Sequence, residues 1–307
     1  MEAQQLSEHV FSLPFRPPFF IGYLAPNVYL VRDGDEGALV DSGFSDDDSV
    51  NQRLAWLRGA NVRIRYILLT HHHFDHASGA HRLAEALGAQ VVLHAQEQPF
   101  LEAWREEVPQ DMDIPAGQEE VRQRIQRFRY DAAQAARDPL WVQDETELKI
   151  GRLVLHICYT PGHTMGSICI WMPQEGILFT GDTALGLGTV AVSPPPYGDM
   201  GLYLRSLERL KNLGPQILLP GHGPPVKDAI RKIQELIDHR REREEQILGL
   251  LAQGKDTVTS LVQAIYPELD GRILPMAHRQ VSAHLHKLMQ EGQVLLIEAE
   301  EPRYVLA

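Results

Sequence analysis

The amino-acid sequence predicts an α/β fold: an αββα sandwich of four layers with a helical insertion, followed by a small domain of winged-helix type. Three observations predict it. Short apolar stretches rich in β-branched residues and closed by glycine alternate with amphipathic segments. The second half of this pattern repeats the first half in a shorter form. Three helical segments and a β-hairpin complete the 307 residues, a length that suits one large and one small domain at about 150 residues per domain.

The first half contains predicted strands that carry polar residues at their ends. The segments NVYLVRDG and EGALVDSG each close on glycine and are expected to pair. The apolar segment RIRYILLT leads directly into a run of histidines, and the helix after that run is expected to stop at Gly88. The predicted elements are strands at 27–34 and 36–43, a helix at 51–60, a strand at 63–70, a helix at 77–87 and a strand at 91–95.

The second half follows the same plan. LKIGRLVLHICYT alternates around a glycine turn, and SICIWM and GILFTGD follow it. We therefore expect each half to be a β-meander and the two sheets to pack face to face. A helix at 203–212 and the buried strand QILLP lead to the loop GHGPP, where the large domain is expected to end.

Residues 97–145 depart from this plan. They hold few β-branched residues and place Val121, Ile125 and Phe128 at helical spacing, so a helical insertion is expected. A long insertion beside an expected active site is a candidate lid. Its aromatic residues could line an apolar pocket or anchor the helices; they are Trp104, Phe128, Tyr130 and Trp141.

The C-terminal residues predict a separate domain. A long helix from 227 to about 251, a helix after Thr257, a helix from about 277 to 290 and the hairpin QVLLIEAEEPRYVL together describe a winged helix. The expected domains are therefore residues 1–226 and residues 227–307.

The composition excludes several classes of protein. Apolar residues make up 44% and charged residues 23% of the chain, which is typical of a globular protein with a substantial core. The net charge of −12 repels phosphate backbones and argues against general nucleic-acid binding. The two cysteines, Cys158 and Cys169, exclude a disulfide scaffold and are expected in the core. Because there is no secretory signal and no apolar run near the roughly 20 residues that cross a bilayer, we expect no membrane partner and a cytoplasmic location.

The strongest functional signal is the segment THHHFDH at the end of an apolar strand. Residues two apart on an extended chain point the same way, so His71 and His73 can bind one metal ion while His72 faces elsewhere. Asp75 and His76, beyond the turn, can reach a second ion. Imidazole and carboxylate ligands suit zinc, and the lack of a thiolate leaves manganese and iron as alternatives. A surface histidine run or an artificial tag does not fit the position directly after RYILLT.

Three further fragments are placed to complete the site. PGHT, TGDT and PGHG contribute His163, Asp182 and His222, and each follows an apolar strand and is flanked by glycine, which allows tight bends around an ion. Tyr197 and Tyr203, shortly after Asp182, could donate a hydrogen bond to an oxyanion. Packing is the stronger interpretation for Tyr203, because it opens a predicted helix.

Together with Asp41 in ALVDSG, these fragments resemble the five motifs of the metallo-β-lactamase superfamily, in order, across roughly residues 20–226. The pattern is closer to glyoxalase II, lactonases and RNA-processing members than to class B1 β-lactamases, because Asp182 stands where those have cysteine and because His76 is present. The resemblance implies that Asp75 and Asp182 are catalytic. It assigns His71, His73 and His163 to a first metal, Asp75, His76 and His222 to a second metal, Asp182 to a bridge between them, and Asp41 to the orientation of ligands.

The same resemblance implies a mechanism. A bridging carboxylate implies two ions about 3.5–4 Å apart that share a hydroxide, the nucleophile. Metal binding lowers the pKa of water from 15.7 to about 7, so no serine or cysteine nucleophile is required. The ions can also polarise a carbonyl or phosphoryl oxygen and hold the developing negative charge.

The C-terminal segment suggests a narrower likeness. HRREREEQILGLL, AHRQVSAHLHKLMQEG and the closing hairpin are similar to the winged-helix tail of the group around beta-lactamase-like protein 2. That group includes an endoribonuclease, so RNA is a candidate substrate. However, residues 227–307 hold 11 basic and 13 acidic residues, whereas a DNA-binding winged helix has a basic face. Because Val281, Leu285 and Leu288 form a packing stripe, we expect this domain to cover the catalytic domain or to form a homodimer contact.

The sequence therefore predicts a hydrolase that uses a metal-bridging hydroxide to cleave a small ester, thioester or lactone. Its expected cofactors are two divalent ions, Zn²⁺ first, with Mn²⁺ or Fe²⁺ as alternatives. An endoribonuclease or phosphodiesterase acting on single-stranded RNA is the first alternative, favoured by the tail and disfavoured by the charge. A weakly active ligand-binding regulator is the second, disfavoured because every ligand position is intact. The expected partner is a small molecule.

Several other polar residues have structural explanations. His94 and His156 lie in predicted strands and are expected to be hydrogen-bonded there. Residues 97–145 hold 12 acidic and 6 basic residues, so the arginines of the inserted helix could receive an anionic substrate or simply pair with acidic neighbours. These arginines are Arg122, Arg124, Arg127 and Arg129.

Overall fold

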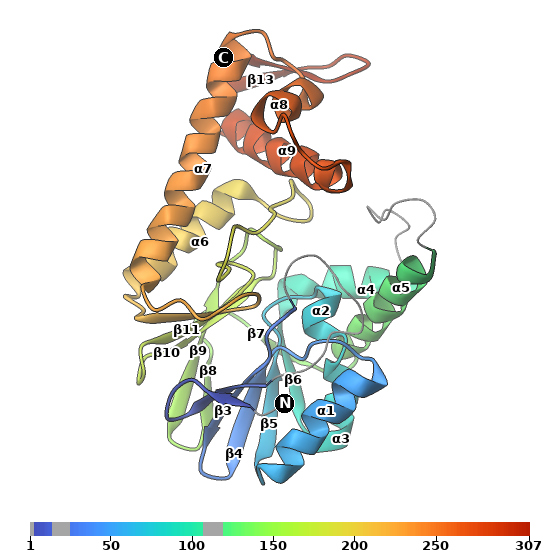
Figure 1. Cartoon of the computed structure of the whole chain (residues 1–307), viewed down its shortest axis with the longest axis vertical. Helices are drawn as coiled ribbons and strands as arrows, with labels where there is room; N and C mark the ends of the chain where they lie inside the picture. Colours follow the sequence, from blue (N-terminus) through green and yellow to red (C-terminus); the bar gives the residue numbers. More distant parts are fainter. Residues whose placement is uncertain (1–2, 14–24, 107–118) are drawn as a thin grey trace.

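The structure is a computed structural model that describes residues 3–13, 25–106 and 119–307. Its larger part has two sheets face to face, with helices on both outer sides (Figure 1). The long helix α7 (Ala229–Ala252) leads from this sandwich to a smaller C-terminal domain. The predicted four-layer α/β sandwich with a winged-helix tail is confirmed.

In the described residues the first sheet has seven strands, and their order in the sheet is their order in the chain. The first four pair antiparallel, and β4 to β7 pair in parallel. Parallel neighbours need crossover connections, which helices provide here. The strands are β1 (Gln4–Gln5), β2 (Val10–Ser12), β3 (Tyr29–Asp33), β4 (Glu36–Val40), β5 (Arg63–Leu68), β6 (Gln90–His94) and β7 (Leu140–Val142).

The second sheet has the order β12-β11-β10-β9-β8. Strands β8 to β11 form an antiparallel meander, and β12 joins β11 in parallel after a helical crossover. The strands are β8 (Glu147–Ile150), β9 (Leu153–Tyr159), β10 (Ile168–Met172), β11 (Ile177–Gly181) and β12 (Ile217–Pro220).

The helices of the sandwich have ends encoded in the sequence. The side chain of Asp46 accepts a hydrogen bond from the backbone N–H of Ser49 at the start of α1, and Asp199 caps α6 in the same way. Helix α3 ends at Gly88, whose φ of 63° is left-handed and favours glycine. The helices are α1 (Asp47–Gly59), α2 (Phe74–Ala77), α3 (Ala80–Leu87), α4 (Gln98–Glu106), α5 (Glu119–Ala133) and α6 (Met200–Asn212).

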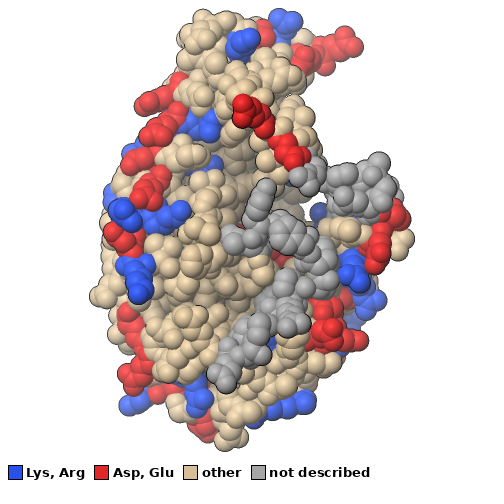
Figure 2. Space-filling view, in the orientation of Figure 1, with Lys and Arg blue, Asp and Glu red and all other residues tan. Residues whose placement is uncertain are grey.

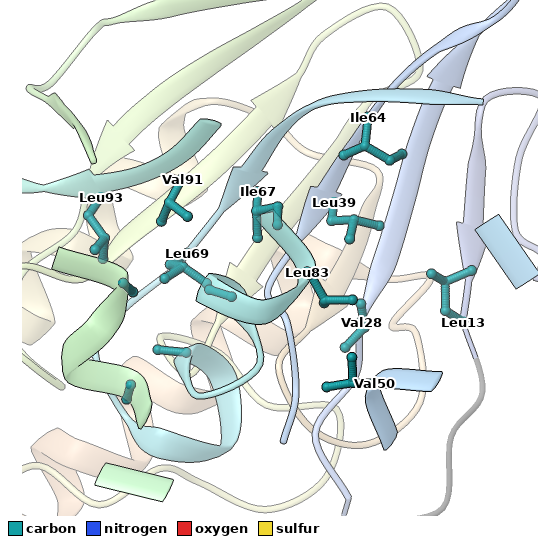
Figure 3. Packing of buried hydrophobic residues seen from close by; sticks show 14 of the residues in the cluster. Leu13, Val28, Leu39, Val50, Ile64, Ile67, Leu69, Leu83, Val91 and Leu93 are labelled. Carbon is teal, nitrogen blue, oxygen red and sulfur yellow. The ribbon is translucent and has the colours of Figure 1, made fainter. Parts of the chain in front are cut away.

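Side chains of the central strands alternate between two apolar cores, as a side-chain period of two requires. In β3, Tyr29 and Val31 point into the core between the sheets, whereas Leu30 points to the core under the helices. Figure 3 shows this outer core, in which Ile67 of the sheet and Leu83 of α3 belong to one cluster. A third core joins the second sheet to α6 and α7. Three cores therefore hold the four layers together.

The C-terminal domain has its own apolar core, to which α7 contributes one side. The predicted stripe of Val281, Leu285 and Leu288 is buried in it. Thr257 and Ser260 form a capping box at the start of α8. The elements are α8 (Val258–Ile265), α9 (Leu274–Gln290), β13 (Val294–Ile297) and β14 (Arg303–Leu306).

Two expectations from the sequence are wrong in detail. The first half is not a meander, because helices return the chain to the same end of β4, β5, β6 and β7, which run parallel. The segment 97–145 is not wholly an inserted helix, because its residues Leu140–Val142 form the edge strand β7. Residues 107–118 of that segment lie outside the described residues. The structure also adds β1 and β2, which the sequence patterns did not indicate. None of the described helices is long and apolar enough to cross a membrane.

Candidate metal centre

The predicted metal donors lie in four segments that each follow a strand. The segment between β5 and α2 carries His71 and His73, and Asp75 and His76 lie in α2. The remaining three donors follow β9, β11 and β12. A segment at a strand end is anchored by the sheet while its side chains remain free to converge, which is the usual place for a site in α/β folds.

The donor atoms form three overlapping groups, and within each group they lie within 4.8 Å of one another. The groups are His71, His73 and His163; His71, His76 and Asp182; and Asp75, His76 and His222. The first and third groups contain the residues assigned to the two metals by sequence resemblance, and the second group connects them. Among the described residues, His72 belongs to none of the groups.

Asp182 lies between the two outer groups. Its Oδ1 is 3.5 Å from Nε2 of His76, and its Oδ2 is 3.7 Å from Nε2 of His163 and 3.6 Å from Nε2 of His222. A carboxylate in this position can offer an oxygen to each of two ions.

The ring nitrogens of the cluster are not satisfied by protein partners alone. Nε2 of His76 faces Nε2 of His222 at 3.2 Å, and Nε2 of His163 faces Nδ1 of His73 at 3.1 Å. Two imidazole nitrogens share a hydrogen bond only if one of them carries the proton. Within the described ranges, the buried Nε2 of His71 has no hydrogen-bond partner. Because buried polar atoms are normally paired, this set of nitrogen and oxygen donors fits divalent metal ions.

Asp41 ties this cluster to the first sheet. Its φ of 59° is left-handed, a conformation that aspartate tolerates better than most residues. Its Oδ2 lies 2.8 Å from Nδ1 of His76, and its Oδ1 accepts a hydrogen bond from the backbone N–H of Thr70 at 2.8 Å. The hydroxyl of Thr70 lies 3.0 Å from Nδ1 of His71. A bond to the second ring nitrogen fixes the orientation of a ligating imidazole, so Asp41 has the contacts of a residue that orients ligands.

Backbone carbonyls support the donors of the second sheet. Nδ1 of His163 lies 2.9 Å from the carbonyl oxygen of Ala191, a partner to which it can donate. The side chain of Asn27 donates to the carbonyl oxygen of Pro220 at 2.9 Å, two residues before His222. The residues just before β3 of the first sheet thus contact the end of β12 in the second sheet.

His72 points away from the donor groups and pairs with Glu97. Its ring stacks on Phe100, with centroids 4.9 Å apart and planes at 7°, and meets the ring of Trp104 edge-on. Its Nδ1 contacts the Glu97 carboxylate, whose other oxygen accepts a hydrogen bond from the hydroxyl of Thr164 at 2.5 Å. Glu97 is fully buried. It therefore joins the two segments that carry the histidines of the first donor group.

Sequence reasoning missed Glu97 and Ala191. The only local signal for Glu97 is an acidic residue three positions after the strand that ends at His94, and many exposed turns share that pattern. Ala191 acts through its backbone carbonyl, so its residue type carries no signal.

Electrostatics differ between the donor groups. Burial, together with neighbouring imidazoles, holds the pKa of His71 and of His73 well below the usual range, so these rings are neutral. Burial also disfavours the charge on His76, but the surrounding carboxylates, Asp75 first, outweigh burial and raise its pKa to about 10. A ligating imidazole must give up its proton, so metal binding at His76 displaces one.

Two glycines allow the segments to approach closely. A Cβ on Gly221 would lie 2.5 Å from Oδ1 of Asp182 and 2.8 Å from Cε1 of His76. Gly181 has a φ of 46°, and a Cβ there would lie 2.5 Å from Oγ1 of Thr70. A larger residue at either position would push the donors apart.

The two tyrosines considered as oxyanion donors have different surroundings. Tyr203 is buried, and its hydroxyl donates to the carbonyl oxygen of Thr183 at 2.9 Å, so packing is its role. Tyr197 is 55% exposed, and its ring centroid lies 6.1 Å from that of Phe100.

The remaining polar candidates have structural partners. The ring of His94 stacks on Tyr159 with centroids 4.2 Å apart, and Nδ1 of His156 lies 3.4 Å from Glu147. Both cysteines are buried. The arginines of α5 have local partners: Arg122 with Glu119, Arg124 with Glu120, Arg127 with Asp131, and Arg129 over the ring of Trp104.

The aromatic residues of the inserted segment mainly anchor it. Trp104 and Phe128 are buried, and Trp141 packs on the core under the helices, whereas Tyr130 is exposed.

Two protein families match parts of this chain. Residues 21–222 match the Metallo-beta-lactamase superfamily, and residues 257–299 match the Beta-lactamase associated winged helix domain. Among solved structures, a metallo-beta-lactamase family protein from Thermus thermophilus is similar, with a TM-score of 0.78 and 28% identity over 99% of this chain and 100% of that chain.

Two named proteins are similar to this chain over most of its length. The Beta-lactamase-like protein 2 homolog of Drosophila melanogaster is 30% identical over 292 residues, which cover 91% of this chain and 87% of that protein. The Atrochrysone carboxyl ACP thioesterase of Aspergillus fumigatus is 28% identical over 260 residues, which cover 79% of this chain and 69% of that protein.

Proposed function

Because this chain belongs to the metallo-beta-lactamase superfamily of hydrolases, we propose that it is a dinuclear metal-dependent enzyme that cleaves a small ester, thioester or lactone. The observation that carries the proposal is the position of Asp182, whose two oxygens face members of both outer donor groups. A single-ion site would need only one of these groups. The arrangement therefore favours two ions joined by a carboxylate.

In this proposal each donor has one assignment. His71, His73 and His163 would hold one ion, Asp75, His76 and His222 would hold the other, and Asp182 would offer an oxygen to each. The imidazole and carboxylate donors of these groups suit zinc, and the lack of a thiolate among them leaves manganese and iron as alternatives that metal analysis would distinguish.

Two bound divalent ions supply a hydroxide nucleophile at neutral pH and a Lewis acid that polarises the oxygen of the scissile bond. The chain itself supplies position. Asp41 holds the ring of His76, and the carbonyl of Ala191 holds the ring of His163, so both present Nε2 to the cluster. The carboxylate of Asp182 faces both donor groups, and its negative charge would attract divalent cations more strongly than a neutral side chain would.

Charge favours a small substrate over a polyanion. The chain carries a net charge of −12. On the face shown in Figure 2, the described Lys and Arg residues are interspersed with Asp and Glu and form no continuous basic track. The arginines of α5 that could have received a phosphate backbone pair with acidic neighbours on the same helix or with Trp104. The similarity to a protein named a thioesterase adds support for a carbonyl-centred substrate.

A phosphodiesterase that cuts single-stranded RNA is the second candidate. Its support is the winged-helix domain and the similarity to a Beta-lactamase-like protein 2 homolog over most of the chain. The hydroxide that such a metal site supplies could attack a phosphorus atom as well as a carbonyl carbon.

A substrate panel tests the proposal. One zinc-loaded and one manganese-loaded preparation would be assayed with aryl esters, acyl thioesters, lactones and a labelled RNA oligomer, with Asp182→Asn as the control for contaminating hydrolases. We expect turnover of at least one carbonyl substrate that Asp182→Asn loses and that changes little with salt. RNA cleavage that falls steeply as salt rises, is lost in Asp75→Ala and occurs without esterase or thioesterase activity would replace the proposal by its alternative.

A further inference from the structure

Two buried hydrogen bonds join the C-terminal helices to the segment between β11 and α6. The side-chain oxygen of Gln280, on α9, accepts a hydrogen bond from the backbone N–H of Val192 at 3.0 Å. The guanidinium of Arg240, on α7, donates to the carbonyl oxygen of Val190 at 2.6 Å. These two contacts flank Ala191, the residue whose carbonyl faces Nδ1 of His163.

A second path leads from Arg240 to Asp182. The guanidinium of Arg240 lies 5.4 Å from the centre of the Tyr203 ring, a cation–π contact. The hydroxyl of Tyr203 donates to the carbonyl oxygen of Thr183, the residue after Asp182. The buried Arg240 thus contacts residues next to two predicted metal ligands: the segment that positions His163 and the tyrosine that bonds beside Asp182.

These contacts lie inside the protein, where they cannot be replaced by water. Arg240 is 2% and Gln280 8% exposed. Val190 and Val192 belong to the same apolar cluster as Ala283 of α9. Glu244 of α7 fastens the two helices to each other, because it accepts a hydrogen bond from Lys287 of α9 at 2.8 Å. The C-terminal helices and the 190–192 segment are therefore packed together as one unit.

We propose that Arg240 and Gln280 are positioning residues of the metal centre, so that the C-terminal domain sets the metal affinity on the His163 side. The proposal rests on the metal site of the proposed function but not on its substrate. It gives the winged-helix domain a role in the active site that requires no nucleic acid.

The physical argument is the orientation of one imidazole. The carbonyl of Ala191 fixes which nitrogen of His163 carries the proton and where Nε2 points. The Ala191 carbonyl belongs to the same peptide group as the N–H of Val192, which donates to Gln280. The carbonyl of the preceding residue, Val190, accepts from Arg240, and both hydrogen bonds are buried. Removing either bond leaves a backbone group unpaired, so the segment shifts to find another partner and takes the carbonyl with it. Loss of such an outer partner typically weakens metal binding by about 10- to 100-fold.

Metal titration of two test variants, two control variants and one conservative variant tests this proposal. Gln280→Met keeps the volume of the side chain and removes the acceptor, and Arg240→Met removes the donor. Gln290→Ala, exposed on the same helix α9, and Arg241→Ala, the exposed neighbour of Arg240, are matched controls. Zinc affinity would be measured by competition with a chromophoric chelator, and the folded state would be checked by thermal unfolding of the metal-free protein.

We expect Gln280→Met and Arg240→Met to weaken one of two zinc affinities by about 10- to 100-fold and the controls to leave both within about threefold. Gln280→Glu, which keeps an acceptor, should restore most of the affinity. If Gln280→Met and Arg240→Met lower the melting temperature while folded protein binds both ions as tightly as the unmodified chain, the residues only stabilise the fold and the inference is wrong. If the unmodified chain binds fewer than two ions, the failure belongs to the proposed dinuclear site instead.

Discussion

The two sheets support the metal centre in different ways. The first sheet supplies four donors from the single segment 71–76, and its support is local: Asp41, at the end of a neighbouring strand, contacts both His76 and Thr70. The second sheet supplies three donors from three separate segments. The support of two of them leads to the C-terminal helices, through Ala191 for His163 and through Tyr203 for Asp182.

This difference shows how far each part of the site depends on the rest of the molecule. A donor segment with local support keeps its geometry when distant contacts change. Donors on separate segments keep theirs only if the packing between those segments is maintained. Substitutions in the first sheet should therefore act through the atom removed, whereas the second sheet should also respond to changes far from the metal.

The largest effect is expected within the histidine run. His71→Ala and His73→Ala should lower kcat/KM by more than about 100-fold, because each removes a metal donor rather than a residue that only orients one. His72→Ala should keep both ions and most of the turnover. It should cost about 3 kcal/mol of unfolding free energy, because it empties the space beside Phe100 and Trp104 and removes the imidazole that pairs with the buried Glu97.

Metal content, turnover and chemical unfolding of these three variants would check the prediction. An equal loss of metal and turnover at all three positions would show that the run is not divided between the metal cluster and the core.

Asp182→Asn should have the next largest effect. The amide keeps the shape of the side chain but removes the charge that faces His76 and His163. We expect one of the two ions to be lost on dialysis and kcat/KM to fall by about 100-fold. Elemental analysis after dialysis measures the first effect, and full retention of both ions would mean that Asp182 does not join the two donor groups.

Asp41→Asn should be milder, because it changes a partner of a ligand. Asparagine tolerates the left-handed backbone at this position and still offers an oxygen to Thr70. Loss of the charge beside Nδ1 of His76 should weaken metal binding by about 10-fold. Chelator competition measures it, and unchanged affinity would remove Asp41 from the residues that orient ligands.

The smallest effect concerns the two buried thiols of the second sheet, Cys158 in β9 and Cys169 in β10. Burial raises the pKa of Cys158 to about 11 and that of Cys169 to about 12. Folded protein at pH 8 should therefore react slowly with a disulfide reagent, whereas both thiols of denatured protein should react at once. Because the folded thiols hold their protons more tightly than unfolded thiols of pKa about 9, their contribution to stability should be lost as pH rises from about 9 to 12. Rapid labelling of both thiols in folded protein would contradict the packing described for this region.

Much of this site follows from the sequence because its signals are local. Strand alternation separates His72 from His71 and His73, and glycine-flanked motifs after apolar strands mark His163, Asp182 and His222. The sandwich and the winged helix follow from the same period-two and helical patterns.

The features that the sequence did not reveal are contacts between residues far apart in the chain. Glu97 meets His72 and Thr164 only after β6 and β9 are packed, and Gln280 meets Val192 only after the C-terminal domain docks. The parallel pairing of β4 to β7 likewise depends on helices returning the chain, which a pattern of single strands does not encode.

The most direct test of the account is the number of metal ions in active protein. The unmodified chain would be stripped with a chelator, titrated with zinc or manganese, and followed at the same time by elemental analysis and by turnover of its best carbonyl substrate. We predict that activity reaches its plateau at two ions per chain. Full activity at one ion per chain, with no further binding, would contradict a dinuclear centre joined by Asp182.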